Sequence, residues 1–138
     1  MIIPKENITD YIPQKKPFVM IDDLLEASLE GFESNFKVME DTLFIESACL
    51  TEPALIENIA QTCAAGFGYL QKQGNEEPKI GFIGAITKLV VHSLPGINGL
   101  ISTNIKVIHQ LENVFLVRGE NFCESRKLVE CEMKIVII

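Results

Sequence analysis

Residues 51–74 read TEPALIENIAQTCAAGFGYLQKQG, and this stretch predicts one long helix. Thr51 is the candidate N-cap, because a threonine hydroxyl can accept a backbone N–H of the first turn. Pro53 suits that turn, where proline gives up an N–H that has no partner, and Gly74 is a natural stop. Apolar residues occupy almost every side of the helix, so we expect it to be buried almost all round.

Three polar side chains interrupt the first half of this apolar helix. Glu57 and Gln61 are four residues apart and share one face, and Asn58 lies beside them. Burial without a neighbouring cation favours the protonated form of a carboxyl group, which suits a general acid. Glu57 is therefore the first candidate for catalysis. The alternative is that it is only hydrogen-bonded, to Gln61 or to the backbone of a loop.

The composition limits the class of protein. The chain of 138 residues suits one domain, residues 1–138, and its net charge of −7 argues against nucleic acid as a partner. We see neither an apolar run of membrane-spanning length nor a secretory signal, and we expect a cytoplasmic location. The four cysteines form no CxxC pair, so free thiols are expected, with no metal and no bound redox cofactor.

The remainder of the chain predicts β-strands. Apolar content, period-two alternation and turn residues place them at 18–27, 32–38, 80–91, 100–111, 114–123 and 128–138. We therefore expect an α+β fold in which an antiparallel sheet of about five to six strands wraps around one long helix. One sheet covers only part of such a helix, so a dimer is expected, with the strand from Ile80 as its candidate edge.

Four stretches, taken together, resemble the hotdog fold and, within it, the dehydratases that act on beta-hydroxyacyl chains of acyl carrier protein. They are IPQKKPFVMIDDLLEA (12–27), PALIENIAQTCAA (53–65), GFIGAITKLVV (81–91) and HSLPGINGL (92–100). The pattern is most similar to the dehydratase-like proteins of aryl polyene and flexirubin pigment synthesis. The resemblance implies a lyase of fatty acid or polyene-type synthesis. Its acyl thioester substrate would be carried on the phosphopantetheine of acyl carrier protein or CoA, and it would need no other cofactor.

In such dehydratases a histidine takes the alpha proton and a carboxyl group on the central helix protonates the leaving hydroxyl. The resemblance implies that Glu57 is this acid and that Gln61 matches the glutamine after it. It also implies that the strand backbone at Gly84 and Ala85 lines a substrate tunnel. Further candidate substrate-binding residues are Asn58, Phe18, Phe67 and Phe82, the three phenylalanines being chosen by residue type.

Two features depart from the family pattern. The loop before the helix, LFIESACLTEP (43–53), has no histidine, and Gln14 stands where the pigment-pathway relatives often carry one. We keep Gln14 as a candidate catalytic position. Pro53 has no N–H to offer an oxyanion at the helix start. The two histidines, His92 and His109, are predicted to lie away from Glu57.

The sequence leaves three functions open. The chain could be a 3-hydroxyacyl thioester dehydratase, a hotdog thioesterase in which Glu57 activates water, or a non-catalytic carrier-binding or partner subunit. The expected partners are acyl carrier protein or acyl-CoA, in a homodimer or higher oligomer, or in a heteromer with another hotdog subunit. Candidate contacts for an acidic carrier are Lys15, Lys16, Arg126 and Lys127, although such charges are more often simply solvated.

Overall fold

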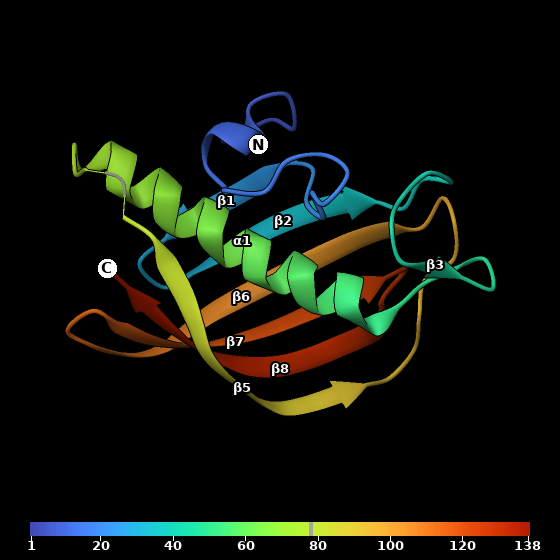
Figure 1. The fold of residues 1–138 in the computed structure, drawn as a ribbon. Coiled ribbons are helices and arrows are strands. Elements are labelled where there is room, and N and C mark those ends of the chain that lie inside the picture. The colour runs from blue at the N-terminus through green and yellow to red at the C-terminus, as the bar shows by residue number, and fades with distance from the viewer. Residues whose placement is uncertain (78) are drawn as a thin grey trace.

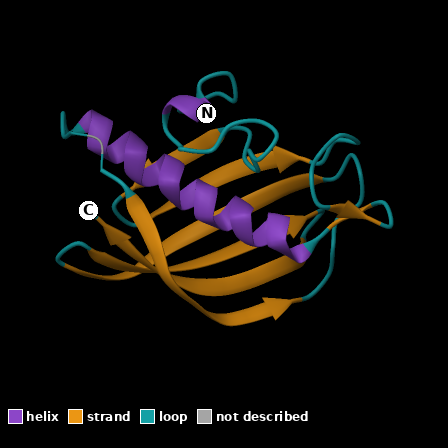
Figure 2. Cartoon of the chain, viewed as in Figure 1, coloured by secondary structure: helices purple, strands orange, loops and turns teal. Residues whose placement is uncertain are grey.

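The computed structural model describes residues 1–77 and 79–138, in which one long helix lies across a curved antiparallel sheet (Figures 1 and 2). The helix, α1, spans Glu52–Gln73. Within the described residues the sheet has six strands in the order β1-β2-β6-β7-β8-β5. They are β1 (Leu24–Ser28), β2 (Gly31–Lys37), β5 (Gly81–Val91), β6 (Leu100–Leu111), β7 (Val114–Cys123) and β8 (Arg126–Ile137). This confirms the predicted α+β architecture.

Three short elements lie outside the main sheet. A 3-10 turn, η1 (Ile8–Asp10), precedes the segment that leads into β1. A small hairpin of β3 (Ile45–Glu46) and β4 (Cys49–Leu50) leads into α1.

The ends of α1 lie where the sequence placed them, with Thr51 as N-cap and Gly74 as C-cap. The predicted role of the Thr51 side chain is wrong, because its hydroxyl donates to the carbonyl of Phe44 at 2.7 Å instead of accepting a helix N–H. The first-turn N–H groups of Ala54 and Leu55 bond to the Thr51 carbonyl instead. The hydroxyl thus joins the start of the helix to the residue that precedes β3.

The helix packs closely on the sheet because two glycines allow it. A Cβ at Gly66 of α1 would overlap the ring of Phe32 on β2, and a Cβ at Gly119 of β7 would overlap the side chain of Ile59. Ile59 itself has no exposed surface. The predicted alternation of β8 is confirmed, since its inward residues are all buried: Val129, Cys131, Met133, Ile135 and Ile137.

The first predicted strand is too long by six residues. The strand β1 begins at Leu24, although Asp22 and Asp23 already share backbone hydrogen bonds with Asn35 of β2. The preceding residues Phe18 and Met20 bond to α1. Side-chain amides of the helix form hydrogen bonds with backbone groups of this segment. For example, the N–H of Met20 donates to Gln61 Oε1. We refer to residues 12–23, which precede β1, as the N-terminal segment.

The outer edge of β5 is unpaired within the described chain, since β5 bonds only to β8. Six of its apolar side chains are between 41% and 52% exposed, namely Phe82, Ile83, Ile86, Leu89, Val90 and Val91. An apolar strand with a free edge is suited to pairing with another chain. Dimer formation through this edge stays a prediction.

Candidate functional site

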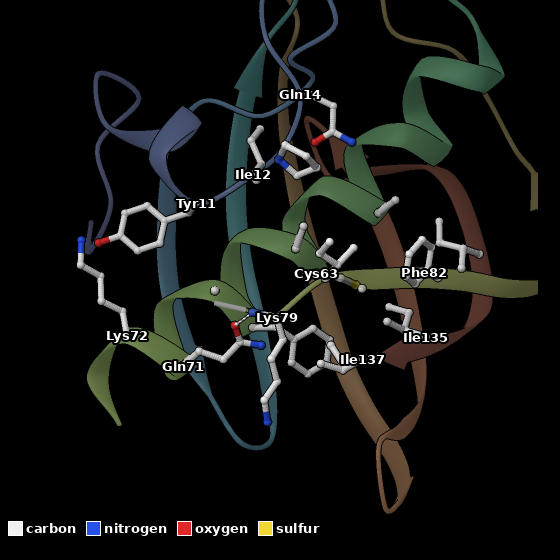
Figure 3. A pocket seen from close by; sticks show the side chains of 18 of the residues that line it. Tyr11, Ile12, Gln14, Cys63, Gln71, Lys72, Lys79, Phe82, Ile135 and Ile137 are labelled. Carbon is white, nitrogen blue, oxygen red and sulfur yellow. Dashed lines mark hydrogen bonds between the residues drawn. The ribbon is translucent and has the colours of Figure 1, made fainter. Parts of the chain in front are cut away.

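A groove of about 520 Å³ lies between α1, the N-terminal segment and β5. Its apolar lining comes from Ile12, Ala60, Cys63, Ala64, Phe67, Phe82, Ile83, Ile135 and Ile137. Figure 3 shows Gln14 at one end of the groove and Gln71 and Lys79 at the other. The groove is therefore an apolar channel along α1 with polar groups toward its ends.

Glu57 lines this groove in a half-buried position on α1. Its Oε2 accepts a hydrogen bond from Gln61 Nε2 at 2.6 Å, across one helical turn. Among the described residues Oε1 has no hydrogen-bond donor. One oxygen of the carboxyl group is thus held by the protein and the other is left for chemistry.

Gln61 is fully buried, and backbone groups fix the orientation of its carboxamide. Its Oε1 accepts the N–H of Met20 at 2.6 Å, and its Nε2 donates to the carbonyl of Phe18 at 2.9 Å. A backbone N–H can only donate and a carbonyl can only accept, so Nε2 must be the atom that faces Glu57. Gln61 therefore acts as a donor toward the carboxyl group.

Gln14 lines the same groove from the N-terminal segment (Figure 3). Its Oε1 is buried and has no hydrogen-bond partner in the described part of the chain. A buried acceptor without a donor costs about 1–3 kcal/mol, so this position is suited to a donor from a bound molecule or a second chain. The structure thus brings Gln14 and Glu57, two predicted catalytic positions, to one groove.

Neither histidine lines the groove. His92 directly follows β5, with its Nε2 3.4 Å from Glu130 Oε2, and His109 is exposed on β6. The start of α1 also lies outside the groove, and its Ala54 and Leu55 N–H groups are already bonded. The groove of the single chain is therefore lined by the carboxyl groups of Asp10, Glu57 and Glu76 but by no imidazole.

Comparison with known proteins identifies the family. The model of the ApeP-like family, described as ApeP dehydratase, matches residues 6–95, which is more than half of the chain. This chain belongs to the ApeP-like dehydratase family. It is thus a dehydratase-like hotdog protein, as the four sequence stretches indicated.

Solved structures share the fold of this ApeP-like chain. The dehydratase heterocomplex ApeI:P from Xenorhabdus doucetiae is similar with a TM-score of 0.85 and 18% identity, covering 94% of this chain and 89% of that chain. The hypothetical thioesterase with coenzyme A from Streptococcus pneumoniae gives a TM-score of 0.67 at 8% identity, with 84% of each chain covered. The PaaI protein of E. coli gives 0.67 at 12% identity, covering 83% and 81%. A search of curated proteins finds no match.

The other predicted site residues of this ApeP-like chain divide into two groups. Phe67 and Phe82 line the groove, and Phe67 packs edge-on against Phe32 with ring centroids 5.0 Å apart. Outside the lining lie Phe18, Asn58, Gly84 and Ala85. Phe18 is 56% exposed. Asn58 is fully buried, with its side chain bonded to strands β6 and β7 of the sheet. Their assignment to substrate binding stays a prediction.

Lys127, a predicted carrier contact, is engaged on the sheet. Its Nζ lies 2.7 Å from Glu130 Oε2 and 3.0 Å from Glu120 Oε2. The hydrogen bond from Lys127 is the main cause that holds the pKa of Glu130 below its ordinary value. Arg118 lies 3.3 Å from the same carboxylate. Lys127 is therefore a partner of strand carboxylates rather than an unpaired cation for an acidic carrier.

Among the described residues, the thiols form neither a disulfide nor a metal site. The four cysteines are free, and burial raises the pKa of the Cys63 thiol in the groove wall and that of Cys131 to about 11. In residues 1–77 and 79–138 no three histidine, cysteine, aspartate or glutamate side chains are grouped to hold a metal ion. Over the same residues, α1 is not apolar enough for a membrane-crossing helix, and no other helix is long enough.

Proposed function

We propose that this chain is the acid-bearing subunit of a dehydratase that removes water from 3-hydroxyacyl chains carried on acyl carrier protein. The observation that carries the proposal is the Glu57 carboxyl group, held at one oxygen by Gln61, in the wall of an apolar groove. Membership of the ApeP-like dehydratase family supports the reaction class. The apolar lining suits an acyl chain, which gains free energy on leaving water.

The chemistry requires an acid and a base. A base takes the C2 proton, the electron pair of that bond forms the C2–C3 double bond, and the C3–O bond breaks. The hydroxyl leaves as water after receiving a proton from Glu57. Because Gln61 donates to Oε2, the proton that Glu57 transfers resides on Oε1. The proton taken by the base then returns to the carboxylate through solvent.

The base in this proposal comes from a second hotdog subunit, because no imidazole lines the groove of this chain. Two observations support a heteromeric assembly. The free apolar edge of β5 is suited to pairing, and the most similar structure described above is named a dehydratase heterocomplex. Gln14, with its buried unpaired acceptor, lies where a donor from the substrate or the partner would complete the site.

The carrier and the compartment belong to the same proposal. The phosphopantetheine arm that bears the substrate is the only prosthetic group that the reaction needs, and CoA thioesters carry the same arm. Lys15 and Lys16, exposed beside the groove-lining Gln14, remain candidate contacts for an acidic carrier protein. The free thiols suit a reducing compartment such as the cytoplasm.

The test is a mass-spectrometric assay of the assembly isolated from its host. A panel of 3-hydroxyacyl carrier proteins is incubated with the wild-type assembly, with Glu57→Ala, and with Glu52→Ala as the matched control. Glu52 is an exposed carboxylate at the start of the same helix. We expect products lighter by one water, formed by the wild type and the control and lost with Glu57→Ala. If Glu57→Ala forms as much dehydrated product as the wild type, Glu57 is not the catalytic acid.

A thioesterase is the second candidate, and one observation favours it. No histidine lines the groove, and one carboxylate, here Glu57, is sufficient in kind to activate water against a thioester. The same incubations distinguish the two reactions, because hydrolysis releases free acid and leaves the carrier thiol unacylated. Binding of the acylated carrier without any product would instead identify a carrier-binding or partner subunit.

A further inference from the structure

Four of the polar side chains buried among the described residues belong to one hydrogen-bonded series, although the core around them is apolar. Asn58, Gln61 and Asn121 have no exposed surface, and Thr103 is 1% exposed. Thr103 lies on β6 and Asn121 on β7, more than forty residues from the helix pair in sequence. Buried polar groups need partners, and these four are joined by hydrogen bonds that lead to Glu57.

Asn121 starts this series, and backbone groups fix its orientation. The N–H of Val129 donates to Asn121 Oδ1 at 3.1 Å, and Asn121 Nδ2 donates to the carbonyl of Leu55 at 3.0 Å. Neither contact survives a reversal of the carboxamide, because a donor would face a donor and an acceptor an acceptor. Asn121 Nδ2 therefore points at α1, where Asn58 Oδ1 lies 3.3 Å away.

Asn58 continues the series from the sheet to the N-terminal segment. Its Oδ1 accepts from Asn121 and from the hydroxyl of Thr103, and its Nδ2 donates to the carbonyl of Met20 at 2.7 Å. Reversing this carboxamide would set its oxygen against the Met20 carbonyl. The donors from Thr103 and Asn121 therefore fix the Asn58 carboxamide in the orientation in which its Nδ2 donates to the Met20 carbonyl.

The backbone of Met20 connects Asn58 to Gln61, which in turn contacts the carboxyl group of Glu57. The Met20 N–H donates to Gln61 Oε1, and Gln61 Nε2 donates to Glu57 Oε2, each at 2.6 Å. Gln61 Nε2 also donates to the carbonyl of Phe18, so the helix amides hold this stretch of backbone at two points. The N–H and the carbonyl of Met20 belong to different peptide groups, so the constraint passes through the position of the Met20 backbone.

We infer that Thr103 and Asn121 are positioning residues for Glu57, acting through Asn58 and the backbone of Met20. They touch neither the groove nor the carboxyl group, and their effect is to set where residues 18–20 lie and hence where Gln61 holds Oε2. The kinetic consequence rests on the proposed function, whereas the structural consequence does not.

The experiment removes one hydroxyl. Thr103→Val keeps the volume and loses the donor to Asn58, and Thr103→Ser restores it. The matched control is Thr62→Val, because Thr62 is equally buried but bonds to Ser34 and to the backbone carbonyl of Asn58. Two quantities are measured on the assembly: amide hydrogen exchange at Met20, and kcat and KM for dehydration.

With Thr103→Val we expect exchange at Met20 to accelerate at least about tenfold, and kcat to fall roughly ten- to a hundredfold with little change in KM. Thr103→Ser should recover both, and Thr62→Val should change neither beyond its general effect on stability. Equal acceleration at Met20 by Thr62→Val would overturn the inference. So would faster exchange with unchanged kcat in an active assembly.

Because a substituted chain could fail to fold, a second measurement uses the wild-type chain alone. In the wild-type chain, a scalar coupling across the hydrogen bond should join Asn58 Nδ2 to the carbonyl carbon of Met20, and its absence would overturn the series. If the exchange responds as expected but the wild-type assembly dehydrates nothing, the positioning network stands and the proposed function fails. The two claims are thereby separated.

Discussion

Gln61 is expected to stabilise the fold as well as to orient Glu57. Replacing it by methionine keeps the volume and the length of the side chain but removes three hydrogen bonds. The carbonyl of Phe18 and the carboxyl of Glu57 can recruit water, because Phe18 is exposed and Glu57 is half-buried. The N–H of Met20 cannot, since Met20 has no exposed surface.

The magnitude follows from this difference. One fully buried donor left without an acceptor costs about 1–3 kcal/mol, and the two rehydrated groups add roughly 0.5 kcal/mol or less each. Gln61→Met should therefore lower the free energy of unfolding by about 1–4 kcal/mol. For a chain of this size that corresponds to a fall in Tm of roughly 3–14 °C.

Urea denaturation followed by circular dichroism measures this loss. The control is Gln71→Met, since Gln71 lies on the same helix but makes one exposed hydrogen bond, to the N–H of Lys79, and should change stability by less than about 0.5 kcal/mol. A Gln61→Met protein whose free energy of unfolding lies within about 0.5 kcal/mol of the wild-type value would contradict this prediction. It would mean that the Met20 N–H finds another acceptor.

Three further predictions concern packing, thiol chemistry and pH. Gly119→Ala should destabilise the fold by about 1–3 kcal/mol, because the new Cβ would overlap the helix residue Ile59. The control is Gly84→Ala, whose new Cβ has no neighbour closer than 3.8 Å and which should leave the stability nearly unchanged. Thermal unfolding of the two variants measures the difference. Cys63 should not react with iodoacetamide at pH 8, because burial raises the pKa of its thiol. Glutathione in the same solution should react, and mass spectrometry of the protein would detect any adduct on Cys63. Glu130, whose pKa the Lys127 hydrogen bond lowers, should stabilise the fold above about pH 4.5 and lose that contribution as the pH falls through its folded value. The stability difference between wild type and Glu130→Gln should therefore shrink in acid, and a constant difference would contradict the sign.

Much of the fold could be predicted because apolar periodicity is a local signal. The helix between Thr51 and Gly74 and the inward alternation of β8 depend only on the residues they contain. The start of β8 was missed by two residues, because the turn uses Glu124 and Ser125 with positive φ angles of 52° and 66°, where glycine or asparagine is usual. Turn chemistry of that kind leaves little trace in a sequence.

The start of β1 could not be predicted for a different reason. The segment before Leu24 is as apolar as a strand, but the side chains of Asn58 and Gln61 satisfy its backbone around Met20. A pairing between side-chain amides and a distant backbone has no periodicity to reveal it.

The candidate site shows the same division. Glu57 and Gln61 were found because a polar pair on an apolar helix is conspicuous, and both belong to the family motif. Asn121 was missed, although one signal was present. It lies in phase with the buried strand residues Val117 and Cys123, so a polar side chain at that position predicts a buried hydrogen-bond partner.

The central claim is that Glu57 protonates the leaving hydroxyl. The most direct test is the single-turnover rate of water loss from a saturating 3-hydroxyacyl carrier protein, measured for the isolated wild-type assembly and for Glu57→Gln. Glutamine keeps the shape and an acceptor for Gln61 but has no transferable acidic proton. We expect a rate at least about a hundredfold lower for Glu57→Gln, with substrate binding retained. Equal rates would show that Glu57 is only a structural hydrogen-bond partner of Gln61.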